Sequence, residues 1–87
     1  MAIVLTAKAP SREIYEQVNA KVGSEVAPGL IVHTASEVDG AVRIVDVWES
    51  AEHAMAFAQD RLGPAIAAAG QQMDMPEIVE VFDLLRP

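Results

Sequence analysis

The sequence predicts an α+β fold of element order β-α-β-β-α-β, with four antiparallel strands in one sheet and both helices on one face of it. Three observations support this class. Short runs of β-branched and aliphatic residues alternate with segments of helical periodicity, Asp39-Gly40 separates the two central runs, and a serine precedes each of the two longer helical segments. Two β-α-β units joined by a central hairpin give the split-βαβ, or ferredoxin-like, arrangement.

The first unit begins with an aliphatic strand over Ala2 to Ala7, which ends before Pro10-Ser11. Ser11 is the expected N-cap of the first helix, and Gly23 is its expected end. The apolar positions of this helix recur at i, i+4 and i+8, as Ile14, Val18 and Val22.

The second unit opens with the hairpin, whose strands are predicted over Leu30 to Val38 and Ala41 to Glu49. Ser50 is the expected cap of the second helix, which the sequence predicts to be interrupted at Gly63-Pro64. A short helical turn over Ala65 to Ala69 and a last strand over Ile78 to Leu85 complete the order.

Length and composition restrict the function classes. The 87 residues suit one domain, 1–87, and the absence of cysteine excludes disulfides, thiolate chemistry and the common zinc frameworks. The net charge of −7 disfavours nucleic acid and anionic membranes as partners. The apolar run Ile3-Val4-Leu5 is too short for a signal segment, so a cytoplasmic location is expected.

The predicted strands carry more apolar residues than two helices can cover. Apolar side chains occupy both alternating sets of strand positions, which would leave one sheet face exposed in a monomer. A chain this short buries only about 60% of its unfolded surface, so association is expected on size as well. We therefore expect a homodimer in which the open sheet faces pack together.

Counting back from a two-residue Asp39-Gly40 turn places His33 opposite Asp46 and Ile31 opposite Trp48. A carboxylate orients a histidine, fixes its tautomer and makes it more basic, which suits a general base near neutral pH. His33 and Asp46 are thus the candidate catalytic residues. The alternative is that the pair only stabilises the sheet, by about 0.2–1 kcal/mol.

Two aromatic residues are candidates for the walls of a substrate pocket. Trp48 lies beside the His33 and Asp46 pair, and Tyr15 lies next to the apolar stripe of the first helix. The alternatives are that Trp48 is a core residue and that Tyr15 covers the edge of the core with its hydroxyl in water. The sequence has no phosphate-binding glycine loop, dinucleotide motif, nucleophile elbow or metal-ligand spacing, so no cofactor or metal is expected.

One run carries a family resemblance. The segment Ile44-Val45-Asp46-Val47-Trp48-Glu49-Ser50, followed by Phe57 and by Arg61-Leu62-Gly63-Pro64-Ala65, resembles the antibiotic biosynthesis monooxygenase-like branch of the dimeric α+β barrel superfamily. The resemblance covers nearly the whole chain. It implies a ferredoxin-like monomer, a homodimer that closes a barrel between two sheets, and a pocket between the sheet and the helices of each subunit.

The branch includes oxygenases that act on aromatic polyketides without flavin, haem or metal. The resemblance therefore implies a cofactor-independent monooxygenase, or a related acid–base enzyme, acting on a small aromatic or polyketide-like substrate. It also implies that Tyr15, Trp48 and Phe57 form the walls of the pocket. The haem-degrading members differ, because the positions that match their functional residues are Thr6, Phe57 and Ala67 here. The alternative function is a non-catalytic protein of the same fold that binds a hydrophobic ligand or acts as a dimeric interaction module.

Overall fold

The computed structural model describes residues 1–72 and 75–85 and has the predicted α+β, ferredoxin-like fold. Four strands form one antiparallel sheet in the order β2-β3-β1-β4. The strands are β1 (Ile3–Ala9), β2 (Leu30–Val38), β3 (Ala41–Trp48) and β4 (Glu77–Glu80). The helices are α1 (Arg12–Val22), α2 (Ala51–Phe57), the π-helical segment η1 (Ala58–Leu62) and α3 (Gly63–Ala68).

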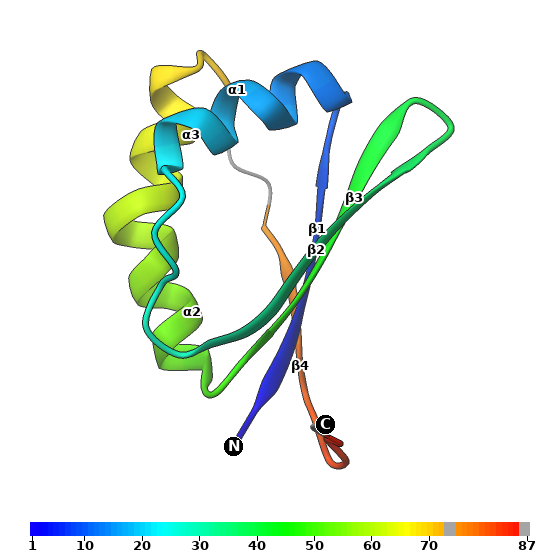
Figure 1. Ribbon diagram of the computed structural model, residues 1–87, viewed down its shortest axis with the longest axis vertical. Helices are drawn as coiled ribbons and strands as arrows, with labels where there is room; N and C mark the ends of the chain where they lie inside the picture. The colour runs from blue at the N-terminus through cyan, green and yellow to red at the C-terminus, as the bar shows by residue number, and fades with distance from the viewer. Residues whose placement is uncertain (73–74, 86–87) are drawn as a thin grey trace.

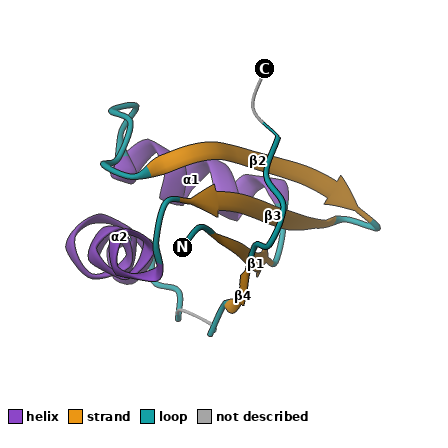
Figure 2. Cartoon of the chain, turned by 90° about the horizontal axis from the view of Figure 1, so that it is seen from below, coloured by secondary structure: helices purple, strands orange, loops and turns teal. Residues whose placement is uncertain are grey.

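The helices all lie on one side of the sheet, and the other side is uncovered (Figures 1 and 2). The serine caps account for the helix starts, since Ser11 accepts a hydrogen bond from the Ile14 amide and Ser50 accepts one from the His53 amide. Within residues 1–72 and 75–85, every helix falls short of the length and apolar character that a membrane span requires.

The hairpin between β2 and β3 has the register that the sequence predicts at its centre. Asp39 and Gly40 both have positive φ, at 52° and 83°, as a two-residue turn of type I′ requires. Val38 therefore faces Ala41, and His33 faces Asp46.

The prediction that Ile31 faces Trp48 is wrong, because a β-bulge between Leu30 and Val32 shifts the register. Trp48 is paired with Leu30 instead. The extra residue turns Leu30 toward the helices, where it packs against the buried cluster that contains Trp48. The bulge lies beyond His33, so the pairing of His33 with Asp46 is preserved.

The last strand is shorter than predicted, ending at Glu80 instead of Leu85. Glu80 pairs with Ile3, the first residue of β1, and the amide of Val81 makes one further bond to the carbonyl of Ala2, at 2.9 Å. The strand ends here because its partner strand ends. Phe82 is consequently fully exposed.

The second helical segment continues past Gly63-Pro64, where the sequence predicted an interruption. The five residues of η1 form a π turn in which the amide of Gly63 bonds to the carbonyl of Ala58. Pro64 has no amide hydrogen for a regular helical bond, and its ring would press on a carbonyl of the preceding turn. The wider π turn accommodates both constraints, so the axis continues into α3.

The core lies between the helices and the end of the sheet that carries Ile3, Leu30 and Trp48. Trp48 is its largest fully buried side chain, and Phe57 of α2 packs against the indole with 5.3 Å between ring centroids. This cluster fixes α2 against β3 and consists of Ile3, Ala27, Trp48 and Ala54, flanked by Leu5, Leu30, Ala51 and Phe57.

The uncovered face of the sheet carries a continuous row of four valines, one from each strand. Val4 faces both Val47 and Val79, and Val47 faces Val32. Val32 and Val79, at the two ends of the row, are 46% and 49% exposed. Both alternating sets of strand positions therefore carry apolar residues, as the sequence indicated.

Substituting Gly63 by alanine should destabilise the protein, because a Cβ at this position would lie 2.9 Å from the Ala58 carbonyl oxygen. Helix propensity alone would predict a gain of up to about 1 kcal/mol. Urea unfolding measures the difference, and Ala67→Gly, at an exposed position of α3, calibrates the ordinary cost of glycine. A more stable Gly63→Ala protein would show that the π turn does not need the glycine.

Candidate functional site

The pairing of β2 with β3 brings His33 and Asp46 together on the face of the sheet that the helices cover. The Nδ1 atom of His33 lies 2.6 Å from Oδ1 of Asp46. The Asp46 side chain is only 10% exposed, whereas that of His33 is 40% exposed. Because a carboxylate only accepts hydrogen bonds, Nδ1 carries the proton, and Nε2 of the neutral ring is left as an acceptor.

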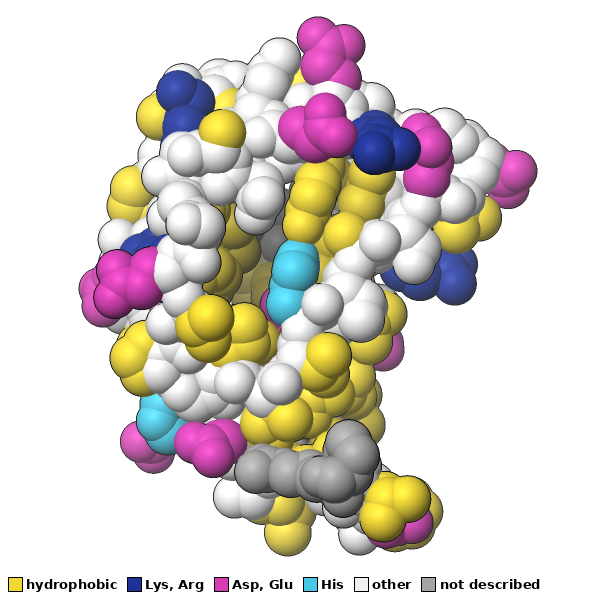
Figure 3. Space-filling model, in the orientation of Figure 1, with side chains coloured by type: hydrophobic (Ala, Val, Ile, Leu, Met, Phe, Trp, Pro, Cys, Tyr) yellow, Lys and Arg dark blue, Asp and Glu magenta, His cyan; other side chains and the backbone are white. Residues whose placement is uncertain are grey.

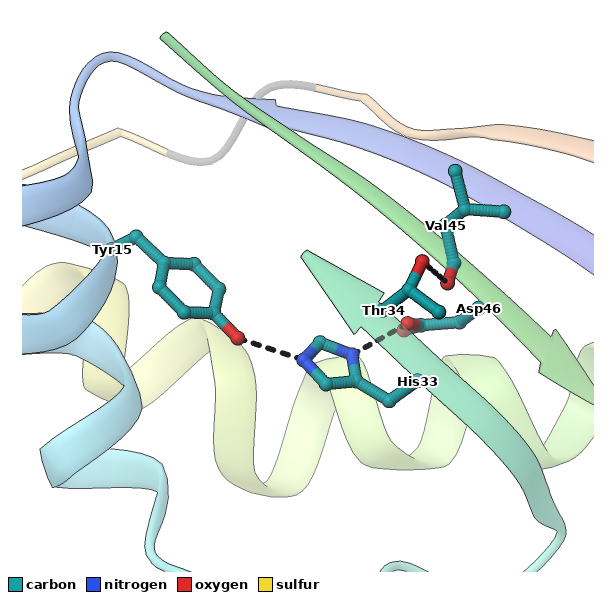
Figure 4. A network of polar contacts seen from close by, with 5 residues as sticks. All are labelled: Tyr15, His33, Thr34, Val45 and Asp46. Carbon is teal, nitrogen blue, oxygen red and sulfur yellow. Dashed lines mark hydrogen bonds and ion pairs between the residues drawn. The ribbon is translucent and has the colours of Figure 1, made fainter. Parts of the chain in front are cut away.

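Tyr15 of α1 supplies the partner of that acceptor. Its hydroxyl lies 2.7 Å from Nε2 of His33, and the two rings are stacked, with 8° between their planes. Figure 4 shows the resulting chain of hydrogen bonds from the helix through the imidazole to the carboxylate. In the neutral state, Tyr15 donates to His33 and His33 donates to Asp46.

The position of Tyr15 follows from the start of α1. Ser11 caps the helix, and the amide of Tyr15 closes the first turn on the Ser11 carbonyl at 3.0 Å. Tyr15 follows Ile14, the first residue of the apolar stripe, so its side chain lies at the edge of that stripe. From this edge the ring points toward β2. The sequence placed Tyr15 near a pocket but did not indicate its contact with His33.

Burial dominates the electrostatics of the site. It raises the pKa of Asp46 above the usual range, while the hydrogen bond and charge of His33 act in the opposite direction. Burial also raises the pKa of Tyr15, and repulsion from Asp46 raises it further. Tyr15 therefore keeps its proton at neutral pH and can act as a donor to His33.

The surface is hollowed between the helices and the sheet, with a histidine at the margin of the hollow (Figure 3). A groove of about 270 Å³, here called the α1 groove, is lined by residues of α1, β2 and β3. Tyr15 belongs both to the groove wall and to the hydrogen-bonded chain. The lining residues are Arg12, Tyr15, Glu16, Ala35, Ser36, Glu37 and Val42.

Trp48 and Phe57 contact each other and take no part in lining the α1 groove. Phe57 instead borders a second hollow of about 130 Å³, together with Pro28, His53 and Arg61 among others. The structure thus brings Tyr15, His33 and Asp46 into one chain. Trp48 lies two residues after Asp46 on β3 and therefore faces the same side of the sheet.

Arg61 is a residue whose role sequence reasoning missed. Its guanidinium lies 5.4 Å from the centroid of the Phe57 ring and donates to the carbonyls of Val22 and Glu25, at 3.0 and 2.9 Å. These bonds attach the end of α1 to η1 and so support the helix that carries Tyr15. Sequence spacing gives no signal for them, because the partners lie 36 and 39 residues away.

Among the residues described, no group of three or more histidine, aspartate or glutamate side chains is arranged to hold a metal ion.

The titration of Tyr15 tests the electrostatics directly, because it is the only tyrosine. Phenolate absorbance should rise with a midpoint above the ordinary tyrosine pKa of about 10. In Asp46→Asn the midpoint should fall, because the repulsion is removed, while burial keeps it above the ordinary value.

Glu77→Gln is the matched control, since it removes one negative charge from the strand at the far edge of the sheet. This substitution should leave the midpoint in place. An ordinary midpoint in the unsubstituted protein, or equal midpoints with and without Asp46, would contradict the described site.

Comparison with known proteins identifies the fold. No protein-family model matches the chain, and no curated protein matches it. Among solved structures, a candidate antibiotic biosynthesis monooxygenase from Chloroflexus aurantiacus is similar over 99% of this chain and 98% of its own, with a TM-score of 0.72 and 18% identity. SnoaB, a cofactor-independent oxygenase from Streptomyces nogalater, covers the same shares with a TM-score of 0.62 and 17% identity. The chain therefore has the fold of the antibiotic biosynthesis monooxygenase-like proteins.

Proposed function

We propose that this protein is a cofactor-independent monooxygenase that acts on a small phenolic substrate and works as a homodimer. The observation that carries the proposal is the hydrogen-bonded chain of Asp46, His33 and Tyr15, of which Tyr15 lines the α1 groove. The likeness to SnoaB supports the reaction class, because that protein is described as an oxygenase that needs no cofactor.

His33 is the proposed general base. Asp46 holds the Nδ1 proton, so the Nε2 lone pair is the basic site, and the partial exposure of the ring lets a substrate approach it. Tyr15 occupies this lone pair in the structure. A substrate phenol either replaces the Tyr15 hydroxyl at Nε2 or passes its proton through that hydroxyl. Tyr15 lines the α1 groove, whereas His33 does not, so Tyr15 is the link between the groove and the base.

The reaction needs no reductant other than the substrate. A phenol with a ring C–H and O₂ give a quinone and water. His33 takes the phenolic proton, the phenolate gives one electron to O₂, and the two radicals join as a ring-carbon peroxide. The imidazolium first returns its proton to the peroxide, which becomes a hydroperoxide. Neutral His33 then removes the ring C–H proton as the O–O bond breaks, so one oxygen stays on the ring as the carbonyl. The other oxygen leaves as hydroxide, which takes this proton from the imidazolium and becomes water.

The size of the groove favours a small substrate. Sites for drug-sized ligands usually enclose about 300–1,000 Å³, and the α1 groove has about 270 Å³. Two carboxylates, Glu16 and Glu37, lie along it against one guanidinium, which already pairs with Glu16 at 3.1 Å. A neutral molecule of one or two rings therefore fits better than a large or anionic one.

The proposed homodimer is formed through the uncovered sheet face. Its row of four valines would be in water in a monomer, and burying apolar surface is favourable by about 25 cal/mol per Å². A second copy offers a surface of the same shape and character, which a two-fold interface requires.

His33→Gln should lower turnover by about 10²–10⁴-fold, because glutamine can hydrogen-bond but cannot accept the substrate proton. Oxygen uptake with hydroquinone-type and simple phenols measures the rate, and incorporation of one ¹⁸O atom identifies the product. His53→Gln is the control, because the His53 side chain bonds to Ser50 at the start of α2 and takes no part in the Tyr15, His33 and Asp46 chain. Unchanged turnover in His33→Gln, or phenols that bind without oxygen uptake, would contradict the oxygenase and favour a ligand-binding protein.

Val47→Asp should separate the dimer, because the charge would lie in the middle of the valine row. Sedimentation at micromolar concentration should give twice the 9.3 kDa chain mass for the unsubstituted protein and the chain mass or an unfolded species for the variant. Gln59→Asp adds the same charge to an exposed position of η1 and should leave the dimer intact. A folded, unsubstituted monomer would refute the proposed assembly.

A further inference from the structure

The indole nitrogen of Trp48, Nε1, is buried without a hydrogen-bond partner among the described residues, which is unusual. Trp48 is the only tryptophan in the sequence, and its side chain is about 1% exposed. Buried donors are nearly always paired, because an unpaired one has lost its bond to water without replacement. Packing against Phe57 explains why the ring is buried but leaves the N–H unexplained.

The nearest ionisable side chain on the same strand is that of Asp46. Residues two apart on a strand point to the same face, and both Asp46 and Trp48 are buried there. His33 occupies Oδ1 of Asp46, but a carboxylate has two oxygens and about four acceptor sites. The indole N–H lies close enough to favour the charged carboxylate, though it does not complete a hydrogen bond in distance and angle.

We propose that Trp48 is a positioning residue for the His33 and Asp46 pair: its indole N–H is the donor for the second side of the Asp46 carboxylate. The contact holds Asp46 in its ionised form, and the ionised carboxylate holds His33 in the orientation that leaves Nε2 as the acceptor. The effect on turnover rests on the function proposed above, whereas the contact itself does not.

Few other groups can take this role. The titratable side chains that face Asp46 are His33 from β2 and Tyr15 from α1, and the residue opposite it on β1 is the apolar Leu5. The backbone of Thr34 also favours the charged carboxylate. Tyr15 donates to His33, so within the described part of the chain the indole is the buried side-chain donor still uncommitted.

The first measurement uses the unsubstituted protein. The ¹H–¹⁵N resonance of the single indole N–H should move with pH at the same midpoint as the Asp46 carboxyl ¹³C resonance, and this inflection should disappear in Asp46→Asn. An indole resonance that does not respond at that midpoint, or that responds equally in Asp46→Asn, would overturn the proposal.

The second measurement uses Trp48→Phe, which keeps an aromatic ring in the core and removes only the donor and the second ring. The midpoint of the Asp46 carboxyl should rise, with proton affinity increased by about threefold or more. Phe57→Leu is the matched control, because it disturbs the same aromatic contact but keeps the N–H, so it should lower stability without moving that midpoint. Equal midpoints in Trp48→Phe and the unsubstituted protein, or equal shifts in both variants, would show that Trp48 only fills the core.

A kinetic readout separates this inference from the proposed function. If the protein is the proposed oxygenase, Trp48→Phe should move the acidic limb of the kcat/KM profile to higher pH, with a smaller effect on the plateau. A protein that never consumes oxygen but shows the coupled indole and carboxyl titrations would refute the function and retain the positioning role. A protein that consumes oxygen, but whose acidic limb does not move in Trp48→Phe and whose indole and carboxyl titrations are not coupled, would retain the proposed function and refute the positioning role.

Discussion

The site depends on one cross-strand contact, the 2.6 Å hydrogen bond between His33 and Asp46. Its existence is a matter of register. Asp39 and Gly40 form a two-residue turn, which sets Val38 against Ala41 and, five residues further along β2, His33 against Asp46. A slip of one residue would send one of the two side chains to the uncovered face of the sheet. The turn therefore determines which side chains meet five residues away from it.

Other contacts in the structure bring Tyr15 to the His33 and Asp46 pair. The buried cluster around Trp48 fixes the sheet beneath α2, and Arg61 attaches the end of α1 to η1. With α1 held in this way, the hydroxyl of Tyr15 reaches Nε2 of His33. Burial makes an ionised carboxylate unfavourable for folding, as the raised pKa of Asp46 indicates, and carboxyl groups perturbed in this way are concentrated at functional sites.

Much of the fold follows from local signals. The Asp39-Gly40 turn, the caps at Ser11 and Ser50, and the strand periodicities were sufficient to predict the element order and the pairing of His33 with Asp46, because each depends on residues close in the sequence. The bulge at Ile31, the π turn before Pro64 and the early end of β4 were not predicted. Each of these arises from tertiary packing or from the length of a partner strand.

The candidate site was predictable in part for the same reason. The contact of Tyr15 with His33 and the bonds of Arg61 join segments whose relative placement depends on how the helices dock. No spacing rule encodes that docking. The pocket-wall roles of Trp48 and Phe57 stay predictions, because the two rings pack on each other and the open groove lies beside Tyr15.

The state of the His33 ring tests the account most directly. A long-range ¹H–¹⁵N NMR spectrum at a pH where the ring is neutral distinguishes the two imidazole nitrogens, and His53 provides an internal comparison. We expect His33 to be held as the Nδ1–H tautomer, with Nε2 unprotonated and its signal altered in Tyr15→Phe. A ring that carries its proton on Nε2, or that exchanges freely between the two tautomers, would contradict this expectation.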